Sequence, residues 1–269
     1  MKVYKLAPVS GLLLLACLCT GCNKLKARDQ LNKGVVAYRN AQFATAIDHF
    51  QRAVSMDPTL LNARLYLATA YAQEYVPGGD TPDNLKTGQE AINAFQQVLQ
   101  IDSTNSNALG SIGQIYYEMK DYNKAKDYQL RLMKIQPNNP DPYYWIGVLN
   151  WLPAYKNDMT LRQQLNLITP KDPTKPDVLP PLPAKARKQL AAQNGPIVDE
   201  GIQSLEKALD LKPDYADAMS YLNLMYRQKA DLETSTDARQ ADLQKADALV
   251  AKALELKKAA AAKQAKSAS

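Results

Sequence analysis

The chain has few of the residues that catalysis and metal binding use. It contains one histidine, His49, and three cysteines that all lie within the first 22 residues. Beyond residue 22 the chain therefore cannot supply a His/Cys metal cluster or a Cys–His catalytic pair. The motifs GxSxG, GxxxxGK[ST] and GxGxxG are missing, and the carboxylate pair Asp199-Glu200 would point about 100° apart on a helix. We predict that the protein is not an enzyme, holds no metal or cofactor and takes no small-molecule substrate.

Signals for β-structure are also scarce. The 269 residues include only three phenylalanines and eleven glycines, and no run of alternating β-branched residues stands out. Aliphatic residues recur instead at helical spacing, which favours an all-α protein. The length suits either one extended array of helices or two globular domains.

The longest apolar run lies near the start, from Leu6 to Leu18, after the basic residues Lys2 and Lys5. It is too short for a stable membrane anchor and is typical of a secretory signal peptide. It ends in the sequence Leu18-Cys19-Thr20-Gly21-Cys22, which resembles the lipobox of bacterial lipoproteins.

The lipobox resemblance implies a signal peptide at residues 1–21, lipidation of Cys22 and a short tether at residues 22–26. Asn23, rather than aspartate, follows Cys22, and by the sorting rule of some Gram-negative bacteria this favours the outer over the inner membrane. The expected location is the cell envelope, facing the periplasm. An ordinary secretory signal that carries a cysteine by chance is the alternative.

Residues Ser106–Pro137 have the pattern of two helices joined by a tight turn. The first has an apolar stripe at Leu109, Ile112, Gly113 and Tyr116, and the second has one at Tyr122, Ala125, Tyr128 and Leu132. Intervals of 34 residues separate Gly34 from Ala68, Ala91 from Ala125, and Gly113 from Gly147. A fixed period of one helical hairpin predicts a stacked solenoid, whereas an ordinary helical bundle would not keep this register.

These positions resemble the tetratricopeptide repeat. Its small residue, aromatic, alanine and closing proline are matched by Gly113, Tyr116, Ala125 and Pro137. Three further units match at Gly34, Ala46, Phe50, Ala53 and Pro58; at Ala68, Tyr71, Ala91 and Phe95; and at Tyr143, Ile146, Gly147, Leu205, Ala208 and Pro213. A fifth unit matches weakly at Leu222, Tyr226, Ala246 and Ala253. The resemblance implies a right-handed α-solenoid of about five hairpins over residues 27–258, followed by an Ala/Lys-rich tail at 259–269.

Insertions interrupt the period in repeats 2, 4 and 5. Ala46 and Ala91 are 45 residues apart, as are Gly201 and Ala246, while Ala125 and Gly201 are 76 apart. Each extra segment falls between the first and second helix of its repeat, and in a solenoid such insertions map to one face or edge.

The longest insertion, residues 153–198, holds eight of the sixteen prolines. That density favours polyproline II structure and predicts no long helix, only short ones at 158–167 and 184–193. The segment is either a semi-rigid surface loop or a functional element that docks into the chain's own groove or onto a partner. We expect the protein to fold without residues 157–194.

The tetratricopeptide resemblance also implies a binding face along the first helices of the repeats. Carried over, that face consists of Leu31, Val35, Tyr38, Arg39, Leu65, Thr69, Gln114, Tyr117, Tyr144, Val148, Trp151, Leu224 and Arg227. This set is apolar and aromatic, and it lacks the lysines and asparagines with which chaperone-binding members hold a terminal carboxylate. Aromatic side chains favour a protein partner, because they dominate binding hot spots. For Val35 and Val148, burial by neighbouring helices is an equal alternative.

Together these features predict a lipid-anchored scaffold that binds a peptide segment of another envelope protein, in the assembly of an envelope complex. One alternative is a structural subunit that assembles through its repeat edges, and another is an accessory factor to a cell-wall enzyme. The formal net charge of +6 is modest, and we expect no nucleic-acid partner.

Overall fold

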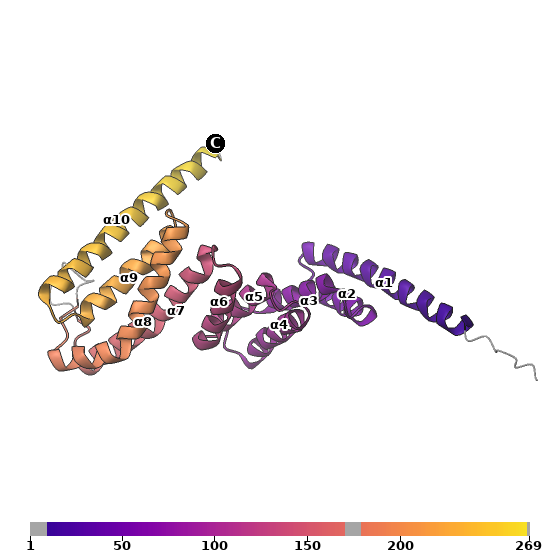
Figure 1. Cartoon of the computed structure of the whole chain (residues 1–269), viewed down its shortest axis with the longest axis horizontal. Coiled ribbons are helices and arrows are strands. Elements are labelled where there is room, and N and C mark those ends of the chain that lie inside the picture. Colours follow the sequence, from indigo (N-terminus) through magenta and orange to yellow (C-terminus); the bar gives the residue numbers. More distant parts are fainter. Residues whose placement is uncertain (1–9, 170–178, 268–269) are drawn as a thin grey trace, which may run out of the picture. The chain divides into compact units, whose positions relative to one another are not determined.

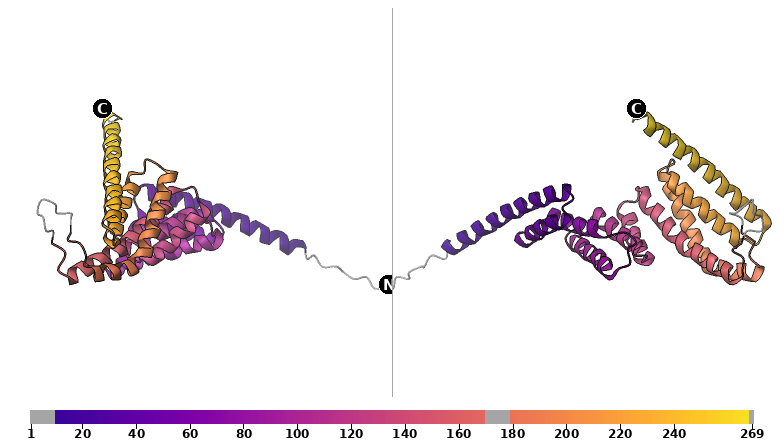
Figure 2. Two further views of the ribbon diagram at one scale, coloured as in Figure 1. Left: turned by 60° about the vertical axis from the view of Figure 1, so that its left-hand side comes forward. Right: turned by 180° about the vertical axis from the view of Figure 1, so that it is seen from behind.

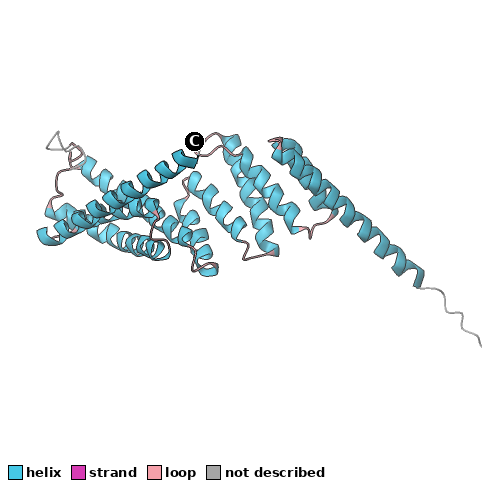
Figure 3. Cartoon of the chain, turned by 90° about the horizontal axis from the view of Figure 1, so that it is seen from above, coloured by secondary structure: helices cyan, strands magenta, loops and turns pink. Residues whose placement is uncertain are grey.

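The computed structural model describes residues 10–169 and 179–267, and throughout these residues the secondary structure is helical (Figures 1 and 3). The helices are α1 (Ser10–Arg39), α2 (Phe43–Met56), α3 (Leu61–Glu74), α4 (Pro82–Ile101), α5 (Ser106–Glu118), α6 (Tyr122–Ile135), α7 (Pro140–Gln164), α8 (Ala184–Leu211), α9 (Ala216–Leu232) and α10 (Thr236–Ser267). They pair in chain order as five hairpins, one for each expected repeat. The predicted all-α fold is confirmed.

The chain divides into two compact units, Met1–Tyr128 and Gln129–Ser269. In the first unit α1, α2, α3 and α4 each pack on the next helix along the chain. In the second unit α7, α8, α9 and α10 do the same (Figure 2). The first helices of neighbouring hairpins also touch, α1 with α3 and α7 with α9, as stacked repeats require.

Short side chains let the helices approach closely. The repeat alanines of the second helices, Ala46, Ala91, Ala125 and Ala246, are completely buried. Glycine has the same role in the first helix of the fourth repeat, because a Cβ on Gly147 would lie only 2.3 Å from Cγ of Leu205.

Side-chain caps fix where several helices begin. Thr81 accepts a hydrogen bond from the backbone N–H of Asn84 at 3.3 Å, directly before Pro82 opens α4. Asn105 and Asn139 cap α5 and α7 in the same manner. The loop between Glu74 and Pro82 therefore ends at a capped helix start.

The proline-rich insertion differs from its prediction. Residues 153–164 continue α7 without a break and residues 184–198 belong to α8, so Pro153 and Pro196 both lie inside long helices. A proline inside a helix costs about 3 kcal/mol, and here the extensive packing of α7 on α8 offsets that cost. Pro170, Pro173 and Pro176 lie outside the described residues.

The N-terminal region is helical from Ser10, and residues 22–26, the expected tether, are exposed on α1. Residues 1–9 of the expected signal peptide lie outside the described part of the chain. Among the described residues, none of the helices combines the length and apolar character needed to cross a bilayer. At the other end α10 continues to Ser267.

Candidate functional site

An open groove lies between α3 and α5, the first helices of the second and third repeats. It consists of two cavities of about 510 Å³ and about 570 Å³ that share Gly110 and Ser111 as lining residues. The first cavity is also lined by Ala72, Gln73, Tyr75, Pro77, Gln114, Ile115 and Glu118, and the second by Leu65, Tyr66, Thr69, Phe95, Ser106 and Asn107.

Helical periodicity explains which side chains reach this groove. From α3 come Leu65, Thr69 and Ala72, spaced four and three residues apart, so they share one face of the helix. From α5 come residues at the same spacings, and the two small ones at its middle, Gly110 and Ser111, leave the space open.

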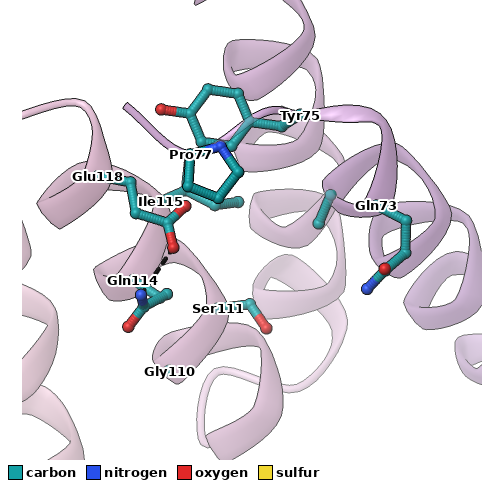
Figure 4. A pocket seen from close by; sticks show the side chains of 9 residues that line it. Gln73, Tyr75, Pro77, Gly110, Ser111, Gln114, Ile115 and Glu118 are labelled. Atoms are coloured by element: carbon teal, nitrogen blue, oxygen red, sulfur yellow. Dashed lines mark hydrogen bonds between the residues drawn. The ribbon is translucent and has the colours of Figure 1, made fainter. Parts of the chain in front are cut away.

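The end of the groove formed by Tyr75, Pro77 and Glu118 is polar (Figure 4). The side-chain amide of Gln114 donates a hydrogen bond to the Glu118 carboxylate at 2.7 Å. Tyr75 is only 4% exposed, and its buried phenol oxygen has no hydrogen-bond partner among the described residues. Burial, and then the nearby Glu118 charge, raise the pKa of Tyr75; the backbone N–H of Gly78 lies near the phenol and opposes this rise, although it is not placed to form a hydrogen bond.

The structure therefore changes the expected chemistry of this groove. Leu65, Thr69 and Gln114 line it as the sequence predicts. Tyr117 instead packs against Tyr122, with ring centroids 6.0 Å apart, and does not line either cavity. More hydroxyl and amide side chains than aromatic rings line the groove.

The candidate residues of α1 lie beside a small apolar core. Leu31, Val35 and Tyr38 are half-buried against the cluster of Ala37, Ala46, Phe50 and Ala70, while Arg39 is exposed. The contribution of these α1 side chains is therefore mainly to packing between the first and second repeats.

In the second unit the face between α7 and α9 is aromatic, as predicted, but its rings pack on each other. Tyr144 and Trp151 from α7 both meet Tyr221 of α9 edge-on, with centroid separations of 5.7 and 5.6 Å. Tyr155 stacks on Trp151 at 5.0 Å and remains 43% exposed. Sequence reasoning missed Tyr155 and Tyr221, although both follow the helical spacing of the predicted residues.

Three other candidates of this unit have different surroundings. Val148 is 1% exposed, so it belongs to the core and cannot line a surface; the neighbouring helices cover it. Arg227 forms an ion pair with Asp247 of α10 at 2.7 Å. Leu224 is half-buried on α9.

A buried cluster of charged side chains follows the aromatic residues along α7. Arg162 is 1% exposed and donates hydrogen bonds to both carboxylate oxygens of Asp158, at 2.9 and 3.0 Å. It also donates to the backbone oxygen of Pro180 and to the carboxylate of Asp231 on α9, both at 2.7 Å. Burial raises the pKa of Asp158 even though the Arg162 charge opposes that shift.

The described end of the insertion is thus held against the repeats. Arg187 adds to this attachment by donating to the backbone oxygens of Glu233 and Leu182, at 3.0 and 3.1 Å. Leu182 itself is 3% exposed. These contacts agree with docking of the segment onto its own chain, and they exclude a free surface loop for residues 179–183.

His49 contacts Gln30 at 2.8 Å, and the described residues contain no group of three His, Cys, Asp or Glu side chains placed to hold a metal ion.

Comparison with known proteins agrees with this architecture. Residues 86–147 match the tetratricopeptide repeat family, and no curated protein matches the chain. A crystal structure of MamA is similar with a TM-score of 0.55 and 16% identity, covering 87% of this chain and 92% of that one. MamA from residue 41 onward, from Desulfovibrio magneticus RS-1, has a TM-score of 0.55 and 17% identity, covering 87% and 96%.

YrrB, described as a TPR protein with an unusual peptide-binding site, is similar with a TM-score of 0.51 and 15% identity. The match covers 85% of this chain and 90% of YrrB. At these identities the likenesses to MamA and YrrB show the shared fold.

Proposed function

Because the chain is built of tetratricopeptide repeats, we propose that it is a non-enzymatic adaptor that binds a peptide segment of another cell-envelope protein. The observation that supports this most directly is the open groove between α3 and α5. Its two cavities adjoin at Gly110 and Ser111, so they offer one continuous path to an extended segment. The description of YrrB as a peptide-binding protein of this fold supports the same role.

The lining of the groove suits recognition of a peptide backbone. Asn107, Ser111 and Gln114 from α5, with Gln73 from α3, present amide and hydroxyl groups that donate and accept hydrogen bonds. Leu65 and Tyr66 add apolar surface at the other end. An extended peptide presents both kinds of group, main-chain amides and alternating side chains.

We further propose that a lipid on Cys22 holds the adaptor at the membrane, with the outer membrane favoured. The support is the lipobox-like sequence before Cys22 and the exposure of this cysteine on α1. The test is Cys22→Ser in the native host. We expect the protein to move from the membrane fraction to the soluble fraction, and retention in the membrane would disprove lipid anchoring.

Site-specific photocrosslinking in the intact envelope tests the adaptor role. A photoreactive amino acid at Ser111, at the centre of the groove, should yield discrete crosslinks to another envelope protein. The same amino acid at Gln100, an exposed residue of α4 that lines neither cavity, is the matched control. Equal crosslinking from both positions would show that the groove is not the binding site, and crosslinks to a second copy of the chain would favour a structural subunit.

A further inference from the structure

The cavity of about 510 Å³ at the Tyr75 end of the groove has a distinct electrostatic character. Glu118 is its single charged lining residue, and the other polar groups there are Gln73, Ser111, Gln114 and Tyr75. No lysine or arginine lines this cavity. The cavity is therefore negative, and it is large enough for one long side chain.

Glu118 has no cationic partner within the described part of the chain. Its hydrogen bond comes from the neutral Gln114 amide, one turn earlier on α5, and none of the ion pairs of the described residues includes it. The Glu118 carboxylate is therefore the one charge in the cavity, and an incoming cation would meet no competing positive charge there.

The unpartnered oxygen of Tyr75 is the second observation. Figure 4 shows its hydroxyl on the Glu118 side of the ring, next to Pro77. A buried phenol without a hydrogen-bond partner costs about 1–3 kcal/mol, so such groups usually have a function or a missing partner. The ring packs closely on Gly88 of α4, since a Cβ on Gly88 would lie 2.9 Å from Cδ2 of Tyr75.

We propose that this cavity binds a basic side chain of the partner segment, arginine in preference to lysine. The inference rests on the proposed peptide-binding function and specifies its chemistry. A guanidinium group carries five N–H donors in a planar fork, which matches a carboxylate flanked by amide, hydroxyl and phenol oxygens. Its aliphatic stem fits against Ala72, Pro77 and Ile115. Lysine has three donors at one point and would satisfy fewer of these acceptors.

The test uses N-acetyl-arginine amide as the probe and the complete chain with Cys22→Ser. Titration is followed by NMR of the side-chain amides of Gln73 and Gln114. We expect saturable shifts with the arginine probe, weaker binding of N-acetyl-lysine amide, and at least tenfold weaker binding of N-acetyl-citrulline amide, the neutral isostere. Equal binding of citrulline and arginine, or no saturable shift, would overturn the proposal.

Glu118→Gln provides the second arm, because glutamine keeps the shape and can still accept the hydrogen bond from Gln114. We expect at least a tenfold loss of affinity for the arginine probe with unchanged thermal unfolding. The matched control is Glu74→Gln, which removes an equal charge from an exposed position on α3 outside the cavity. Equal losses in both variants would mean that only the general negative field attracts the probe.

The outcome is separable from that of the adaptor role. Crosslinks from Ser111 that map to partner segments without arginine or lysine would overturn the basic-side-chain proposal and leave the adaptor role standing. Binding of the arginine probe without any crosslinked partner would support the basic-side-chain proposal and overturn the adaptor role.

Discussion

Arg162→Met is expected to destabilise the second unit strongly, although the substitution keeps most of the side-chain volume. It removes the guanidinium that donates to Asp158, to Asp231 and to the backbone oxygen of Pro180. Asp231 keeps Arg239 as a partner at 3.1 Å. Asp158 is only 2% exposed and loses its counter-ion, so the main penalty falls there.

Breaking a buried ion pair by removing one partner costs about 3–5 kcal/mol, and we expect a loss in that range. Urea unfolding followed by tryptophan fluorescence measures it directly, because both tryptophans, Trp145 and Trp151, lie in the second unit. The control is Arg227→Met, whose ion pair with Asp247 is 42% and 69% exposed. Exposed pairs contribute about 0–1 kcal/mol.

The loss should also depend on pH. Burial already raises the pKa of Asp158 in the folded protein, and without Arg162 this pKa rises further. The folded state then binds more protons than the unfolded state, so stability falls as pH rises from the unfolded pKa through the folded one. The destabilisation should therefore be larger at pH 8 than at pH 5, and adding Asp158→Asn should reduce it. A loss as small as that of Arg227→Met, or a loss that pH does not change, would refute this reasoning.

Three further outcomes follow from the packing. Tyr75→Phe should raise the free energy of unfolding by about 1 kcal/mol, measured by thermal unfolding, because it removes an unsatisfied buried hydroxyl; a loss of stability would show that this hydroxyl has a partner. Gly147→Ala should destabilise by about 1–3 kcal/mol in urea unfolding, since the new methyl overlaps Leu205; an unchanged midpoint would mean that α7 and α8 can separate at no cost. Deletion of residues 157–194 should abolish cooperative unfolding of the second unit, and a cooperative fluorescence transition in that variant would contradict the role found for the insertion.

The deletion prediction reverses the expectation from the sequence. Proline density there indicated extended structure, but the effect of a proline depends on what surrounds it. Asn194 is completely buried and donates to the backbone oxygen of Ala154 at 2.8 Å, tying α8 to α7 beside the two prolines. Such tertiary contacts override local propensity, and the sequence alone does not show them.

The repeat itself was predictable because it depends on local periodicity. The apolar positions follow helical spacing and the hairpins recur at an interval of 34 residues, and both patterns can be seen directly in the sequence. The buried cluster around Arg162 could not be predicted in this way, because its partner Asp231 is 69 residues further along the chain. The i, i+4 spacing of Asp158 and Arg162 was the available signal, but it occurs equally at the exposed pair of Asp48 and Arg52.

The groove shows a finer limit of pattern reasoning. Of the residues predicted on α5, Gln114 lines the groove and Tyr117 does not, while its neighbour Glu118 does. One residue is about 100° around a helix, so an error of one position replaces an aromatic ring by a carboxylate. The sequence prediction favoured bulky aromatic residues as binding residues. The open space of the groove instead comes from small residues such as Gly110 and Ser111.

Packing also distinguishes the aromatic face between α7 and α9 from the groove between α3 and α5. In the second unit Trp151 contacts Tyr155 and Tyr221, and each aromatic pair contributes about 0.5–1.5 kcal/mol beyond its buried area. Alanine at Trp151 therefore removes stability together with any binding, and a loss of partner capture would not identify a contact. Ser111 and Glu118 line an open cavity and take no part in such an aromatic cluster, so substitutions there report on binding itself. On this physical ground the groove between α3 and α5 is where the adaptor role is to be tested.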